Sequence, residues 1–125
     1  MKTINGGVCA AQGFTASGVH CGIRKNKTKR DLALIYSSVP ANAAAVYTTN
    51  LVKGAPLLVT KKHIADGKAQ AVICNSGNAN TCNADGAAVA EEMSALTASA
   101  LHIAPQDVIV ASTGVIGQPD RKSVV

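Results

Sequence analysis

Two hydroxyl side chains and a glycine follow a short apolar run near the end of the sequence. The run, Val108-Ile109-Val110-Ala111, is β-branched, brief and bounded by turn residues, which predicts a buried strand. Ser112 and Thr113 come directly after it, and Gly114 allows a sharp turn and a close backbone approach. Hydroxyls beside unpaired backbone N–H groups can bind a negatively charged oxygen. The competing interpretation is an ordinary tight turn at the end of a strand.

A second stretch of the same design lies upstream. Residues 69–74 predict another buried strand, and the polar segment Asn75–Asn80 follows it. Between the two strands, residues 87–101 predict a helix whose apolar stripe, from Val89 to Ala100, faces a sheet. A strand–helix–strand unit in one sheet is almost always parallel. We therefore expect the two polar segments to open side by side at the sheet edge where ligands of α/β proteins usually bind.

The first half of the sequence predicts a hairpin, a further strand and a short helix. Residues 19–24 alternate and residues 32–36 form an apolar run, so the two segments read as a hairpin. Residues 43–49 predict a third strand, and residues 56–64 predict a helix that begins at a proline. The chain is thus expected to fold as one α/β domain over residues 1–125, with a mixed sheet.

The composition predicts a partner chain and argues against nucleic-acid binding. Hydrophobic residues make up 47% of the chain and charged residues only 15%, so much of the surface is expected to be buried against another chain. The net charge of +5 is local, because five cations lie between positions 24 and 30. This run reads as a solvated turn. Aromatic residues are 2% of the chain, too few for a platform on which bases could stack.

Several kinds of site are not indicated by the motifs. Gly77 lacks the partner glycines of a dinucleotide motif, and no lysine follows as a phosphate loop requires. The cysteines have neither C-x-x-C spacing nor a histidine at a zinc-like interval, so we predict no metal, no cofactor and free thiols in a reducing cytoplasm. No segment approaches the ~20 apolar residues that would span a membrane, and the N-terminus lacks a secretory signal.

No side chain has the sequence surroundings of an activated nucleophile. His63 and His102 lie on or at the ends of predicted helices, where an exposed or capping role is expected. Cys74 ends a buried strand and is expected to be a core thiol. Glu91 and Glu92 are adjacent on a helix and point to different faces, so they cannot act as a pair. The residues thus provide a place for an oxyanion without a nucleophile.

Five stretches carry a resemblance to a known family. They are Gly13-Phe14 with Ala16-Ser17-Gly18-Val19, Asp31-Leu32-Ala33-Leu34-Ile35, Val46-Tyr47-Thr48-Thr49-Asn50, Asn75-Ser76-Gly77-Asn78-Ala79-Asn80 and Ala111-Ser112-Thr113-Gly114-Val115-Ile116-Gly117. The last two, in this order and at about this distance, are the most specific. With these motifs, the sequence from about Gly7 to Pro119 resembles the N-terminal part of ornithine acetyltransferase, the glutamate N-acetyltransferase of arginine biosynthesis.

The resemblance implies a fold, a reaction and a site. The fold would be an α/β layered sandwich with a mixed sheet, DmpA- and ornithine-acetyltransferase-like, incomplete in this chain. The reaction would pass acetyl from N-acetylornithine to glutamate through an acetyl-threonine intermediate; acetyl-CoA as a further donor is left open. Enzymes of this family cut themselves before the threonine, whose freed amine is the base, and assemble as α2β2. By position, the Thr113 hydroxyl and the Gly114 N–H match the family's oxyanion hole.

One departure from the family leaves the role of the lone chain open. The family continues well past the Gly-x-Pro segment before its threonine, whereas this sequence stops at Val125, with a tail from Asp120 that does not resemble the continuation. The nucleophile is therefore expected outside this chain, in a β chain or a longer precursor, and the lone chain is expected to be inactive. Two alternatives are a non-catalytic module that binds a small polar ligand at the Asn75 segment, and an inactive truncated subunit.

Overall fold

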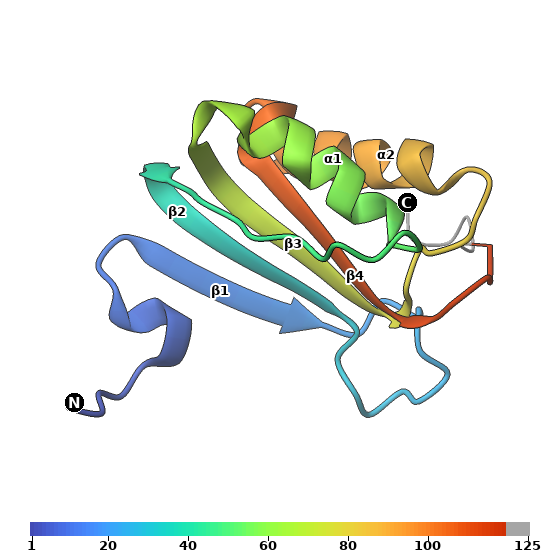
Figure 1. Cartoon of the computed structure of the whole chain (residues 1–125). Helices are drawn as coiled ribbons and strands as arrows, with labels where there is room; N and C mark the ends of the chain where they lie inside the picture. The colour runs from blue at the N-terminus through green and yellow to red at the C-terminus, as the bar shows by residue number, and fades with distance from the viewer. Residues whose placement is uncertain (120–125) are drawn as a thin grey trace.

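Four strands and two α-helices make up residues 1–119, the part of the chain that a computed structural model describes (Figure 1). The strands are β1 (Phe14–Val19), β2 (Leu32–Asn42), β3 (Lys68–Asn78) and β4 (Val108–Val115). The helices are α1 (Ala55–His63) and α2 (Gly86–Leu101), and short 3-10 turns cover Gly7–Ala10, Ile64–Asp66 and Pro105–Asp107. The tail from Asp120 to Val125 lies outside the described residues.

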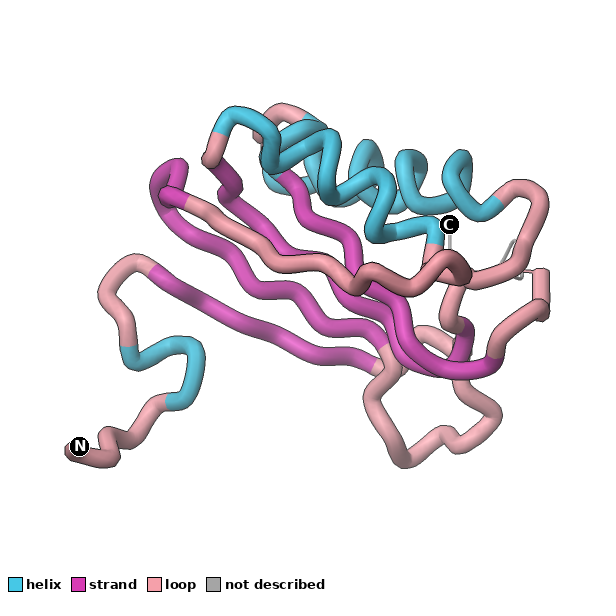
Figure 2. The backbone as a smooth tube through the Cα atoms, in the orientation of Figure 1, coloured by secondary structure: helices cyan, strands magenta, loops and turns pink. Residues whose placement is uncertain are grey.

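The strands form one mixed sheet in the order β1-β2-β3-β4. β2 is antiparallel to both of its neighbours, whereas β3 and β4 are parallel, with Ala71 opposite Val108. α2 connects the two parallel strands, and both helices lie on the same face of the sheet (Figure 2). The predicted α/β fold with adjacent parallel strands near residues 71 and 108 is therefore confirmed.

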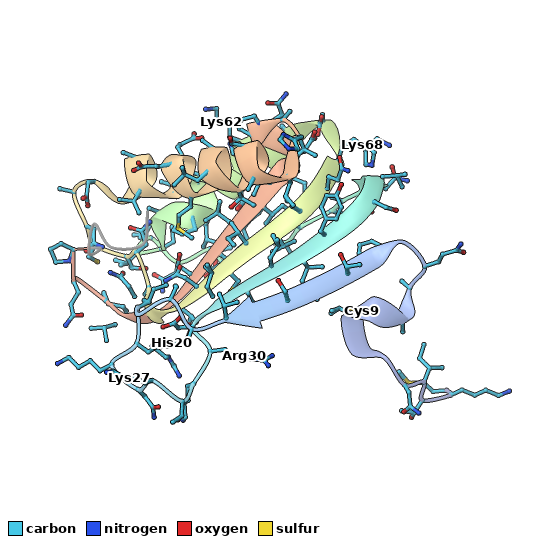
Figure 3. All side chains as sticks on the ribbon, turned by 180° about the vertical axis from the view of Figure 1, so that it is seen from behind. Cys9, His20, Lys27, Arg30, Lys62 and Lys68 are labelled. Carbon is cyan, nitrogen blue, oxygen red and sulfur yellow. The ribbon has the colours of Figure 1, made fainter. Side chains whose placement is uncertain are left out.

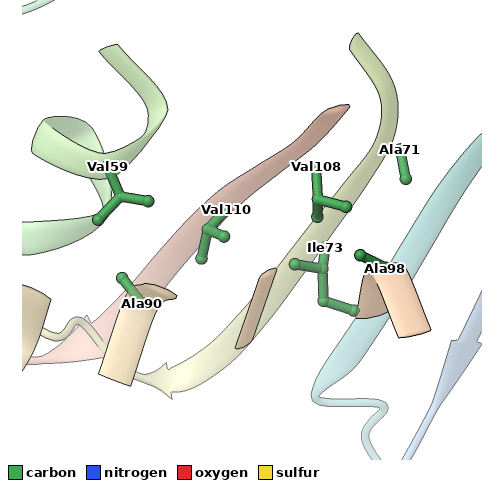
Figure 4. Packing of buried hydrophobic residues seen from close by; sticks show 7 residues of the cluster. All are labelled: Val59, Ala71, Ile73, Ala90, Ala98, Val108 and Val110. Carbon is green, nitrogen blue, oxygen red and sulfur yellow. The ribbon is translucent and has the colours of Figure 1, made fainter. Parts of the chain in front are cut away.

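The hydrophobic core lies between that sheet face and the helices (Figure 4). Its buried members are small or β-branched: Val59, Ala71, Ile73, Ala90, Ala98, Val108 and Val110. The predicted stripe from Val89 to Ala100 on α2 is only partly right: Met93 packs against the core, but Leu96 and Ala100 are exposed, and the fully buried residues are Gly86, Ala90, Ser94 and Ala98. Ala90 and Ala98 are 0% and 1% exposed. Small side chains allow α2 to pack closely on the sheet, which an apolar-periodicity argument does not weigh.

The first strand lies earlier in the chain than predicted. Residues 14–19 form β1, whereas residues 20–24, which were expected to be part of a strand, belong to a loop. The Asp31 carboxylate accepts the N–H groups of Cys21, at 2.7 Å, and Arg24, at 2.9 Å. These bonds take up donors that a strand would give to its neighbour, so this segment does not extend β1.

Residues 43–54 join β2 to α1 without regular structure, so the predicted strand over residues 43–49 is wrong (Figure 2). Local side-chain bonds hold the later part of this segment. The Asn50 N–H donates to Thr48 Oγ1 at 3.1 Å, and the Val52 N–H donates to Asn50 Oδ1 at 3.2 Å. Such bonds offer the backbone an alternative to a sheet ladder.

His63 ties the end of α1 to the sheet and to α2. Its Nδ1 lies 2.9 Å from the Val108 carbonyl oxygen, and its Nε2 lies 3.2 Å from Glu91 Oε2. A carbonyl oxygen only accepts, so Nδ1 is the donor in the contact with Val108. His63 is only 7% exposed, and the predicted exposed or capping role is wrong for it. For His102, the exposed C-cap of α2, that prediction is confirmed.

Replacing Glu91 by glutamine is expected to lower the melting temperature at neutral pH, by an amount that shrinks in acid. The Lys62 hydrogen bond, opposed by burial and aided by His63, holds the pKa of Glu91 below its ordinary value of 4.5. Because the folded state binds this proton less tightly than the unfolded state, the stabilisation is present above pH 4.5 and is lost as pH falls through the lower folded pKa. Thermal unfolding of both proteins from about pH 7 to about pH 3 measures this.

Glu92→Gln is the matched control, because Glu92 is the exposed neighbour on the same helix. A Glu91→Gln deficit that stayed constant down to about pH 3, or that Glu92→Gln reproduced, would contradict the assignment.

Candidate functional site

The two predicted polar segments meet at the C-terminal ends of β3 and β4. Ser76 is paired with Thr113, and Gly77 is paired with Gly114, in the parallel ladder. The prediction that the segments share one sheet edge is therefore confirmed. They differ from the prediction in that both begin as the last residues of strands, because β3 continues to Asn78 and β4 to Val115.

Gly77 and Gly114 come closer than any pair of side chains would allow. A Cβ atom on Gly114 would lie 2.3 Å from the Gly77 carbonyl carbon and 2.6 Å from the Asn78 nitrogen. Both glycines have positive φ, +124° and +135°, which residues with side chains rarely adopt. The register shifts at this point, where Asn78 pairs with both Thr113 and Val115. Glycine is therefore required at a bulge that interrupts the regular ladder beside Thr113.

Thr113, rather than Ser112, presents its hydroxyl at the open surface. Successive side chains of a strand point to opposite faces, so Ser112 lies on the same side as the buried Val108 and Val110. The Ser112 oxygen is buried and has no hydrogen-bond partner within residues 1–119. Thr113 and Gly114 are both exposed. Of the two hydroxyls that the sequence places here, only that of Thr113 is accessible to a bound molecule.

Three asparagines shape the end of β3 and the segment that follows it. The Asn75 amide donates to the Asn78 carbonyl at 3.0 Å, and the Asn78 amide donates to the Gln118 carbonyl at 3.1 Å. The Asn80 amide donates to the Gly86 carbonyl at 2.8 Å. All three side chains are buried and bond to the chain itself, which indicates a structural role. They connect the backbone after β3 to the backbone after Thr113 and to the start of α2.

Asp31 is the residue near this edge that sequence reasoning missed. It is 2% exposed, and its carbonyl oxygen accepts the Ser76 N–H at 2.8 Å. Burial alone would raise the pKa of the Asp31 carboxyl, but the Arg24 and Cys21 N–H groups outweigh it, together with the Cys21 thiol and His20. The pKa therefore lies well below its ordinary value of 3.8, and the group is ionised at neutral pH. Its position directly after a cationic run is the signal that could have found it.

The arrangement offers an accessible hydroxyl and backbone at the bulge between β3 and β4. Within residues 1–119, no histidine is hydrogen-bonded to a serine or threonine hydroxyl or to a thiol. All four cysteines are free, and Cys74 is half-buried rather than a fully buried core thiol. Neither α1 nor α2, the helices of the described part, could cross a membrane. At this sheet edge, the described residues thus offer one exposed hydroxyl and no activated nucleophile.

Comparison of sequences gives close relatives over almost the whole chain. Residues 15–124 match the ArgJ family, a range that includes most of the tail from Asp120, so the expectation that this tail does not resemble the family is wrong. The chain is 50% identical over 121 residues to the arginine biosynthesis bifunctional protein ArgJ of Symbiobacterium thermophilum, covering 95% of this chain and 30% of the relative. For the ArgJ protein of Caldanaerobacter subterraneus, identity is 48% over 120 residues, with 95% and 29% covered. The chain therefore spans about three-tenths of the length of these relatives.

Solved structures show the same fold. The ArgJ crystal structure from Bacillus halodurans superposes with a TM-score of 0.86 at 48% identity, covering 90% of this chain and 59% of that chain. Ornithine acetyltransferase complexed with ornithine, from Mycobacterium tuberculosis, superposes with a TM-score of 0.83 at 40% identity, covering 89% and 61%. The chain belongs to the ArgJ family, and its mixed sheet with two helices is part of the ArgJ fold.

Proposed function

We propose that this chain supplies the oxyanion hole of a glutamate N-acetyltransferase of arginine biosynthesis. Acetyl passes from N-acetylornithine to a threonine of the enzyme and then to glutamate. Family membership supports this, as do relatives named for arginine biosynthesis and a structural neighbour that is an ornithine acetyltransferase complexed with ornithine. The nucleophilic threonine lies outside this chain, on the β chain of the same precursor, in an α2β2 assembly in the cytoplasm.

The single observation that carries the proposal is the exposed Thr113–Gly114 pair on a bulge that packs closely against the backbone of β3. Gly114 is in contact with Gly77 and Asn78 on β3. Donors held in this way need no reorganisation when charge develops on a bound carbonyl oxygen, so they lower the barrier rather than tighten substrate binding.

Each half-reaction places negative charge at the same oxygen. The threonine oxygen attacks the acetyl carbon, and its proton passes to the base, the freed amine of that threonine. The carbonyl electron pair moves to oxygen, where the Thr113 O–H and the Gly114 N–H donate. Cleavage of the C–N bond then releases ornithine, whose nitrogen takes up a proton. The glutamate amine attacks the acetyl ester, the oxyanion forms again, and its collapse releases N-acetylglutamate and restores the threonine hydroxyl.

Exposed apolar residues, some of them next to the site in the chain, support a covering partner. Val115 and Ile116 follow the Thr113–Gly114 pair and are 49% and 63% exposed. Val46 and Leu51, in the segment between β2 and α1, are 99% and 94% exposed. Large apolar side chains gathered at a surface mark interaction sites. A threonine-bearing chain seated here would bring the nucleophile to the oxyanion hole and exclude water from it.

Acetyl transfer from N-acetylornithine to glutamate is expected only when this chain is combined with the remaining, threonine-bearing part of the family sequence. The assay measures N-acetylglutamate formed by the lone chain, by the threonine-bearing part and by both together; a parallel assay with acetyl-CoA tests it as a further donor. No transfer by the combined parts would overturn the proposal. Binding of N-acetylornithine by the lone chain without any transfer would instead favour the binding-module alternative.

A further inference from the structure

We propose that Asp31 is a positioning residue for the Thr113–Gly114 pair, and that it acts through the Asp31-anchored loop, residues 20–30, which presses on Gly77. The effect on turnover rests on the function proposed above, whereas the mechanical link between Asp31 and Gly114 does not. Neither Asp31 nor the loop needs to touch the reacting atoms for this role.

The Asp31 carboxylate organises the loop from inside. Its side chain is 0% exposed. Oδ1 accepts the Cys21 N–H at 2.7 Å, and Oδ2 accepts the Arg24 N–H at 2.9 Å. His20 Nδ1 lies 3.0 Å from Oδ2 and 3.0 Å from the Lys29 carbonyl oxygen. Both of these are acceptors, so Nδ1 carries a proton and links the two ends of the loop.

The loop lies directly on Gly77. A Cβ atom on Gly77 would be 3.0 Å from Ile23 Cγ2 and 3.1 Å from Arg24 Cγ. The Arg24 N–H donates to the Asp31 carboxylate, so this hydrogen bond fixes the position of Arg24 relative to Gly77. Asp31 is also bonded through its backbone to the residue before Gly77, because its carbonyl oxygen accepts the Ser76 N–H.

Gly77 passes this constraint to Gly114. The two glycines pair across the ladder, and the missing Cβ of Gly114 would lie 2.7 Å from the Gly77 Cα. Gly77 is therefore enclosed between the loop on one side and Gly114 on another. Since neither glycine has a side chain to hold it, its conformation depends on these neighbours. Loosening the loop frees Gly77 and, with it, the amide and hydroxyl donors of β4.

The charge of the loop explains why a carboxylate is suited to this task. Five cationic residues lie between positions 24 and 30 and repel one another. Figure 3 shows His20, Lys27 and Arg30 on this loop, at the end of the sheet where β3 and β4 finish. A buried ionised acid that accepts backbone N–H groups opposes this repulsion, and a neutral amide of the same size does not.

The first test compares hydrogen exchange of the complete enzyme with that of its Asp31→Asn variant. The amide keeps one acceptor but sets an NH2 group against a backbone donor, so the loop should loosen. Exchange is expected to rise by about tenfold in residues 76–78 and 112–115, as well as in the loop. Glu91→Gln is the matched control, because it also exchanges a carboxylate for an amide, and its contact with His63 lies at the other end of β4. It should raise exchange in neither segment beyond the general rise that its lower stability causes.

A second variant keeps the test decisive if Asp31→Asn does not fold. Ile23→Ala removes the methyl group that faces Gly77 and leaves the carboxylate in place. It is expected to raise exchange in residues 76–78 and 112–115 in the same way. Faster exchange confined to residues 20–30, in either variant, would overturn the inference.

The kinetic test is a double-mutant cycle in the complete enzyme. Asp31→Asn is expected to lower kcat by ~10–100-fold with a smaller change in KM, the cost of misplacing groups without removing them. If Asp31 acts through the Thr113–Gly114 pair, the two substitutions should not have independent effects. The fold-loss in kcat of the Asp31→Asn/Thr113→Ala double variant should then be much smaller than the product of the two single fold-losses. For the control pair, Glu91→Gln and Thr113→Ala, the fold-loss in kcat of the double variant should equal the product of the two single fold-losses.

If the fold-losses in kcat of Asp31→Asn and Thr113→Ala multiply, as expected for the Glu91→Gln control, the inference is overturned and the proposed function stays intact. A Thr113→Ala enzyme with normal kcat would overturn the proposed function. Faster hydrogen exchange in residues 76–78 and 112–115 of the Asp31→Asn variant would still support the positioning role of Asp31.

Discussion

Replacing Thr113 by alanine in the complete enzyme is expected to lower kcat by ~10²–10³-fold with little change in KM. In the proposed mechanism the hydroxyl donates to an oxygen that is fully charged only in the transition state, so its loss should raise the barrier and leave ground-state binding almost unaltered. The Gly114 N–H remains, so the variant should still turn over measurably. Steady-state kinetics with N-acetylornithine and glutamate as substrates measure both constants.

Two further substitutions identify the hydroxyl as the cause. Thr113→Ser keeps the donor and loses a methyl group, so it should retain much of the activity. Ser112→Ala removes the neighbouring hydroxyl, which is buried on the other side of β4, and should leave kcat close to normal. A Thr113→Ala enzyme with near-normal kcat and a lowered melting temperature would show that the hydroxyl only stabilises the end of the strand, at ~1 kcal/mol.

Replacing Gly114 by alanine is expected to destabilise the protein by at least ~3 kcal/mol and to abolish acetyl transfer. The new Cβ would lie 2.3 Å from the Gly77 carbonyl carbon, which is backbone and cannot rotate away. The φ of +135° is also unsuited to alanine. Relief requires β3 and β4 to separate, which displaces the Gly114 N–H from the carbonyl oxygen that it is proposed to bind. Chemical denaturation and the acetyl-transfer assay measure the two effects.

Gly117→Ala separates the clash from the cost of a positive φ. Gly117 has a φ of +74°, and a Cβ atom there would meet nothing within 4 Å. Its replacement should cost only ~1–2 kcal/mol, the usual penalty for a left-handed residue with a side chain. Equal losses of stability for the two variants would contradict the close approach of Gly114 to Gly77.

The amino-acid sequence by itself determined the strand–helix–strand unit that places the site. The β-branched runs near residues 71 and 108 and the helical pattern between them are local signals, and the handedness of the crossover then makes the strands parallel. The two motifs at these strand ends, residues 75–80 and 111–117, also indicated the family. The roles of Thr113 and Gly114 rest on the family resemblance, with the position and exposure of both residues as support.

Only the tertiary structure decided what the strand ends present. Ser112 and Thr113 are both hydroxyl residues after a strand, and their different exposure depends on which face of the sheet is covered by the helices. Residues 20–24 of the predicted strand form a loop instead, because the Asp31 carboxylate accepts a backbone N–H group there. His63 is buried where its ring contacts the Val108 carbonyl oxygen, 45 positions away. The contact of Gly77 with Gly114 is likewise made by residues from separate strands. Periodicity and propensity describe neighbours along the chain, whereas these features depend on bonds and contacts between residues that only folding brings together.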